Sequence, residues 1–131
     1  MGTWGTGITD NDNSADIYDE FFEEFDKGVH PARISKNVIA NNQDSIDSND
    51  FWLALALAQW ETGSLDPAIF TRVKDIVESK QDIELWRECD ASDEDLVKRQ
   101  KDLEEFIAKI SVENANPKVN IKPKKPFWKF W

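Results

Sequence analysis

Oxygen-bearing side chains alternate along the chain near its start. They are Asp10, Asp12, Ser14 and Asp16. This is the spacing with which short acidic side chains converge on Ca²⁺ in a calcium loop. The pattern then departs from that loop, because Ala15 stands in place of its glycine and Phe21 in place of its last glutamate. Capping of a helix explains the same residues, so we expect no cofactor, and cation binding by Asp10 and Asp12 stays open.

Other residues capable of catalysis are scarce or too common to be informative. Cys89 and His30 are the single cysteine and histidine, and they lie far apart in the sequence, so only the fold could pair them. Adjacent carboxylates recur throughout the chain, which removes their value as acid–base signals. The glycines between Gly2 and Gly7 lack the preceding strand and the lysine of a phosphate-binding loop. We therefore expect a protein that is not an enzyme.

Charge is distributed very unevenly along the sequence. Residues 115–131 contain five lysines and no acid, whereas the preceding part holds all 26 acidic residues against 11 basic ones. Such an acidic body repels the phosphates of nucleic acids and membranes and attracts a cationic surface over a long range. We therefore expect a basic protein partner, with no nucleic-acid binding and no stable membrane association.

The first predicted helix carries the carboxylates best placed for such a partner. Its apolar residues, from Ile17 to Phe25, recur at three- and four-residue spacing, and its other face is acidic. The residues that we expect to bind the partner are Asp19, Glu20, Glu23 and Glu24. This pattern suggests an inhibitor of the immunity-protein or antitoxin type, acting on a basic toxin or nuclease. A merely solvated helix face is the simpler alternative for the same residues.

The basic tail ends in the sequence FWKFW, and it offers a second class of function. Trp128 and Trp131 could dock in a groove on a neighbouring molecule, which would make the chain a helical adaptor or assembly protein. The tail could also fold back onto the acidic body, pair with a second copy in a homo-oligomer, or insert at a membrane interface. Its composition is equally compatible with disorder.

Local signals predict the helices that position these residues. Asn13 or Ser14 can cap the first helix, which ends before Gly28, and Pro31 begins a short second one. A third helix follows a cap among residues 48–50 and extends to Gly63 with almost no polar face, so we expect it to be the most buried.

Further signals predict helices in the second half of the chain. Asp66 and Pro67 are a cap and a first-turn proline, and a brief helical segment is expected around residues 83–86. Ser92, with Asp95 three residues later, starts a last helix that we expect to end near Asn114.

These elements predict one all-α domain. Residues 1–114 should form a compact bundle of five or six helices after a glycine-rich N-terminal loop, and residues 115–131 an extended basic tail. The longest apolar run, residues 51–60, is too short to span a bilayer, and the start of the chain does not resemble a signal peptide. We therefore expect a cytoplasmic protein, in agreement with the single cysteine.

Two tryptophans on the third helix raise the question of a ligand pocket. Trp52 and Trp60 are eight residues apart and nearly on one face, where aromatic residues usually belong to the core. Gln59 and Glu61 could supply polar groups to such a pocket, although the pattern favours a solvated edge for both.

The chain also resembles a small bacterial family of unknown function. The family pattern opens MGxWGxG before an aspartate-rich turn, and it continues with an FWLALAxxQW helix, a G-x-L turn and an acidic helix with a tryptophan. The matching residues here are Gly2, Trp4, Gly5, Gly7, Asp10, Asp12, Phe51, Trp52, Gln59, Trp60, Gly63, Leu65, Asp82 and Trp86. The resemblance covers most of residues 1–110 and implies a bacterial, cytoplasmic, mostly helical protein. It implies no activity, and the tail lies outside the pattern.

Overall fold

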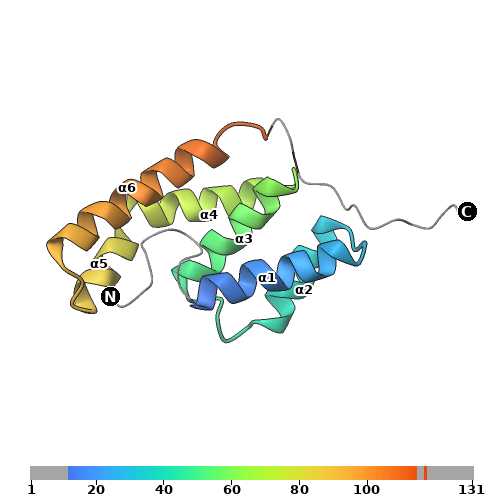
Figure 1. Ribbon diagram of the computed structural model, residues 1–131, viewed down its shortest axis with the longest axis horizontal. Helices are drawn as coiled ribbons and strands as arrows, with labels where there is room; N and C mark the ends of the chain where they lie inside the picture. Colours follow the sequence, from blue (N-terminus) through green and yellow to red (C-terminus); the bar gives the residue numbers. More distant parts are fainter. Residues whose placement is uncertain (1–11, 115–116, 118–131) are drawn as a thin grey trace, which may run out of the picture.

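The computed structural model describes residues 12–114 and 117, and within them the chain forms six α-helices and no strand (Figure 1). The all-α bundle predicted from the sequence is confirmed. The helices are α1 (Asp12–Asp26), α2 (Pro31–Asn41), α3 (Asn49–Glu61), α4 (Pro67–Glu78), α5 (Gln81–Glu88) and α6 (Asp93–Ile110). The predicted glycine-rich loop and nearly all of the predicted tail lie outside the described residues.

Helix α3 is the centre of the bundle because its sequence is apolar on almost every side. Phe51, Leu53 and Leu55 are fully buried, as the sequence pattern predicts. Figure 1 shows α3 between the α1–α2 pair and the group formed by α4, α5 and α6, and α3 contacts α1, α2 and α4. Among the described residues, no helix is sufficiently long and apolar to cross a bilayer.

Side-chain caps fix where several helices begin. The carboxylate of Asp66 accepts a hydrogen bond from the backbone N–H of Ala68 at 2.8 Å, and the hydroxyl of Ser92 accepts one from Asp95 at 3.1 Å. Each cap satisfies a backbone donor that the helix itself leaves without a partner. The predicted starts of α4 and α6 are confirmed.

Two predicted boundaries were wrong. Helix α1 includes Asp12, so Asn13 and Ser14 lie inside the helix rather than capping it, and Ser14 is fully buried. Helix α6 ends at Ile110 instead of near Asn114. The side-chain amide of Asn114 donates to the backbone oxygen of Trp60 at 3.0 Å, so the residues after α6 follow the end of α3.

Candidate functional site

Exposed carboxylates form a stripe along α1. Asp16, Asp19, Glu23 and Asp26 are exposed and follow one another at intervals of three or four residues, which places them on one side of the helix. We call these four residues the α1 acidic stripe. It is about 15 Å long at the helical rise of ~1.5 Å per residue. The 15 residues of α1 include no lysine or arginine, so the stripe is uniformly anionic.

Packing of the opposite side of α1 holds the stripe outward. Phe21 is fully buried and Phe25 is 6% exposed, and the ring of Phe22 lies 5.3 Å and 5.7 Å from these two rings. The hydroxyl of Tyr18 donates a hydrogen bond to the carboxylate of Glu61 on α3. Burial and this neighbouring carboxylate raise the pKa of Tyr18 well above its usual range. Helix α1 is thereby fixed in rotation about its own axis.

Only part of the predicted partner-binding set is in the stripe. Asp19 and Glu23 are exposed, whereas Glu20 and Glu24 are half-buried. Glu20 accepts hydrogen bonds from the side-chain amides of Asn42 at 3.1 Å and Asn41 at 3.5 Å, which joins α1 to the end of α2. Sequence reasoning treated all four carboxylates as equivalent because helical periodicity does not show which residues of α2 lie beside α1.

The neighbour of Glu24 is a lysine from the same turn of the chain. The two side chains form an ion pair at 3.4 Å, with Lys27 on the outer side of the pair. This contact partly neutralises Glu24. The other predicted binding residues, Trp128 and Trp131, lie outside the described residues.

The alternating residues that resemble a calcium loop lie partly in α1, and the helix separates their oxygen atoms. Ser14 is fully buried and Asp16 is exposed, so their oxygens point in different directions, and Asp10 is outside the described residues. Residues two apart in a helix face nearly opposite sides. In the part of the chain that the structure describes, no three His, Cys, Asp or Glu residues are grouped to hold a metal ion.

The single histidine and the single cysteine occupy different local environments. The Nδ1 atom of His30 accepts a hydrogen bond from the backbone N–H of Ala32 at 3.1 Å and so caps α2. Cys89 is exposed directly after α5. This capping contact explains the position of the His30 imidazole.

The two tryptophans of α3 have different roles. Trp52 is 8% exposed and belongs to the core, with its indole N–H donating to the backbone oxygen of Ile46 at 2.7 Å. Trp60 is half-exposed and donates to the backbone oxygen of Val112 at 2.8 Å. The ammonium of Lys109 lies 5.2 Å from the centre of the Trp60 ring. Trp60 therefore joins the end of α3 to the segment that follows α6.

Gln59 is buried, contrary to the solvated edge predicted for it. It is 3% exposed, and its amide nitrogen donates to the hydroxyl of Ser35 at 2.8 Å. Its amide oxygen accepts from the backbone N–H of Asp66 at 3.0 Å. One side chain thus joins α2, α3 and the start of α4.

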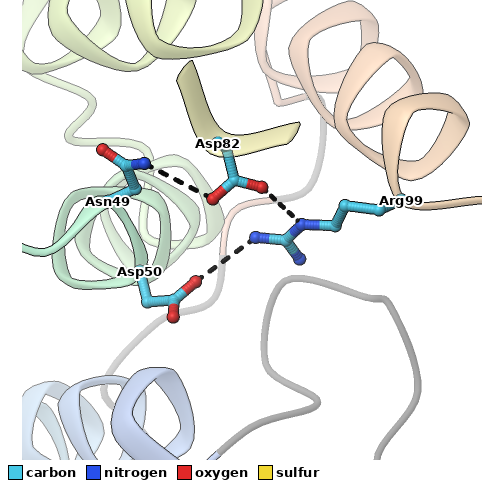
Figure 2. A network of polar contacts seen from close by, with 4 residues as sticks. All are labelled: Asn49, Asp50, Asp82 and Arg99. Atoms are coloured by element: carbon cyan, nitrogen blue, oxygen red, sulfur yellow. Dashed lines mark hydrogen bonds and ion pairs between the residues drawn. The ribbon is translucent and has the colours of Figure 1, made fainter. Parts of the chain in front are cut away.

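A buried ionic network that sequence reasoning missed connects three helices (Figure 2). Arg99 of α6 is fully buried. Its Nε atom lies 2.8 Å from the carboxylate of Asp82 on α5, and its Nη2 atom lies 3.2 Å from the carboxylate of Asp50 on α3. The side-chain amide of Asn49 donates to the other oxygen of Asp82 at 3.5 Å. The guanidinium also stacks on Trp86, 4.9 Å from the ring centre.

A sequence signal for this network does exist. Arg99 stands three residues after Leu96 and four before Leu103, so it occupies the inward stripe of α6. A charged residue at such a position requires a buried partner. The network holds α3, α5 and α6 together, and its contacts are those of a structural ion pair.

Two hollows flank the turn between α3 and α4. One, of about 320 Å³, lies between this turn and the residues after α6, and it is lined by Trp60, Ile110 and Pro117 among others. The other, of about 500 Å³, lies between α2 and the start of α4. We call it the α2–α4 hollow; its walls include Ala32, Ser35, Lys36, Ile39, Leu65 and Ile69. Gly63 and Leu65 line both hollows.

No protein-family model, curated protein or solved structure matches this chain. The bacterial family resemblance drawn from the opening motif and the α3 sequence therefore stays a prediction.

Proposed function

We propose that this protein is a binding module that recognises a basic protein partner through the α1 acidic stripe, as an inhibitor of the immunity-protein or antitoxin type does. The observation that carries the proposal is the exposure of Asp16, Asp19, Glu23 and Asp26 on one side of a helix without cations. The net charge of −10 has the same sign as the stripe.

The rigidity of α1 supports recognition by this surface. The aromatic side chains on its inner face are buried in the core, and contacts from Tyr18 and Glu20 tie it to α3 and α2. A surface carried by a helix whose backbone is already fixed loses less conformational freedom on binding than a surface on a mobile segment. A partner with lysines or arginines at a similar spacing would therefore be met by a preformed surface.

Electrostatic recognition of this kind acts mainly on the rate of association. A negative surface steers a cationic partner and raises the association rate at low salt, and salt screens the effect. The same field disfavours nucleic acids and anionic membranes, so we propose neither as a partner.

The proposal is tested by capture from the native cell with two matched variants. The first is Asp19→Lys with Glu23→Lys in the stripe, and the control is Asp75→Lys with Glu105→Lys at exposed sites on α4 and α6. Both change the net charge equally. Quantitative mass spectrometry should identify a basic protein retained by the wild type and the control, lost with the stripe variant and weakened by salt. A partner retained equally by both variants would exclude the stripe as the binding surface.

The alternative function, a helical adaptor that uses its aromatic tail, predicts the opposite pattern. Deletion of residues 118–131 should abolish association in that case and leave it intact if the stripe is the binding surface. Salt-insensitive capture would also favour the adaptor, because apolar contacts are not screened.

A further inference from the structure

The segment that leads into the tail is held in a defined place. Trp60 donates to the backbone of Val112, and the amide of Asn114 donates to the backbone oxygens of Trp60 and Glu61 at 3.0 and 3.4 Å. Pro117 is the next described residue, and a Cβ built on Gly63 would lie only 3.0 Å from the Cβ of Pro117. The tail therefore starts against the turn between α3 and α4.

The α2–α4 hollow lies directly across this turn. Gly63 and Leu65 separate it from the hollow that Pro117 lines. Ile39, Leu65 and Ile69 form an aliphatic part of its walls, and polar residues line the rest, among them the hydrogen-bonded pair of Gln59 and Ser35. A space of about 500 Å³ bounded in this way suits an apolar side chain.

The residues beyond Pro117 include apolar side chains that could fill the aliphatic part of this hollow. Residues 118–131 include Val119, Ile121 and the aromatic sequence FWKFW at 127–131. An extended chain covers about 3.3 Å per residue, so ten residues bring Phe127 up to about 33 Å from Pro117. Helix α2 is only about 16 Å long at the usual helical rise. The aromatic residues can therefore reach the hollow of the same molecule.

Charge at the turn favours the same path, whereas Lys36 in the hollow has the same sign as the tail lysines. Glu61, Asp66 and Glu113 flank the turn, and Asp66 and Glu113 are exposed there, whereas the tail contains lysines and no acid. Lys36 is the cation at the edge of the hollow. Its ammonium could lie over an aromatic ring in the hollow, as that of Lys109 lies over Trp60.

We propose that residues 118–131 cross the Gly63–Leu65 turn and place an aromatic side chain from residues 127–131 in the α2–α4 hollow of the same molecule. The hollow is thus an intramolecular docking site for an aromatic, basic segment. This proposal does not depend on the α1 acidic stripe, because it involves neither α1 nor an external partner.

The test compares backbone amide NMR spectra of the full-length chain and a tail variant. The variant replaces Phe127, Trp128, Phe130 and Trp131 by serine and leaves every lysine in place. We expect its amide shifts to differ from those of the wild type at residues 35–39 and 64–69, equally at low and high protein concentration. A second variant with the tail lysines replaced by serine should show smaller changes at the same amides.

Matched tryptophan substitutions locate the docking site. Ala32→Trp puts a large side chain at the rim of the hollow, and Ala108→Trp puts the same side chain on an exposed position of α6. The four-serine replacement should produce no shifts at residues 35–39 and 64–69 in the Ala32→Trp background and undiminished shifts in the Ala108→Trp background. Unchanged amides around the hollow on loss of the tail aromatics would overturn the proposal. So would shifts that grow with protein concentration, because the tail would then occupy a second copy.

Discussion

The Nε atom of Arg99 lies 2.8 Å from the carboxylate of Asp82, and neither side chain is more than 2% exposed. Burying two charges is costly unless their geometry is good, and here Asn49 and Asp50 add further contacts from α3. The pair therefore determines how α5 and α6 are placed on α3.

Removal of one partner from this pair should be strongly destabilising. We expect Asp82→Ala to lower the free energy of unfolding by roughly 3–5 kcal/mol, because it leaves the Arg99 charge buried without its closest anion. Denaturant titration followed by circular dichroism measures the change. The double replacement Asp82→Leu with Arg99→Met should be less destabilising than Asp82→Ala alone. A loss below about 1 kcal/mol for Asp82→Ala, typical of a surface ion pair, would contradict the role assigned to this contact.

Tyr18 should make stability depend on pH in alkaline solution. It is the only tyrosine, and the pKa of its hydroxyl is raised by burial and then by the hydrogen bond to Glu61. Because the folded-state pKa lies above the unfolded value of about 10, this contribution is complete below pH ~10 and is lost as pH rises further. The stability of the wild type should therefore fall more steeply above that pH than the stability of Tyr18→Phe.

Absorbance of the tyrosinate gives a direct measurement of the same effect. Its midpoint in the folded protein should lie above that of a free tyrosine, and Glu61→Gln should lower it only in part, because burial is the larger cause. A midpoint at the ordinary value would show that the hydroxyl is solvated.

Gln59 should contribute to stability through both ends of its amide. Gln59→Leu leaves the Ser35 hydroxyl and the Asp66 N–H without their partner, which we expect to cost about 1–3 kcal/mol. A double-mutant cycle with Ser35→Ala, measured by thermal and denaturant unfolding, isolates one of the two bonds. Additive effects of the two substitutions would show that the bond between Gln59 and Ser35 is not energetically coupled.

A side chain at Gly63 should be destabilising, for two separable reasons. Its φ of +71° is in the left-handed region, which costs an L-residue about 1–2 kcal/mol. An added Cβ would also lie 3.0 Å from Pro117. Gly63→Ala should therefore lower the unfolding midpoint in the wild type, and less so when Pro117 is replaced by glycine. An identical loss in both backgrounds would mean that only the backbone conformation matters.

The elements of this fold were predictable where their signals are local. Asp66 with Pro67, and Ser92 with Asp95, start helices by contacts over two or three residues, and the apolar sequence of α3 requires burial wherever it packs. The start of α1 was predicted too late, because Ser14 resembles a cap in sequence but is covered by the core.

For the candidate site, only the negative charge could be predicted from the sequence. Asp19 and Glu20 look alike in the sequence, and they differ because Asn41 and Asn42 come to lie beside Glu20. The environment of Arg99 likewise depends on Asp50 and Asp82, which come from other helices. Such contacts depend on tertiary packing, which helical periodicity does not reveal.

The bond between Trp60 and Val112 joins residues 52 positions apart. During synthesis on the ribosome, α1 to α3 emerge well before Val112. The carboxyl end of α3 therefore lacks its contact with the segment after α6 until that segment is made. Short helices form within about a microsecond, but this closure depends on a segment that is translated seconds later. A nascent chain that stops before residue 112 would therefore leave the indole N–H of Trp60 without its acceptor.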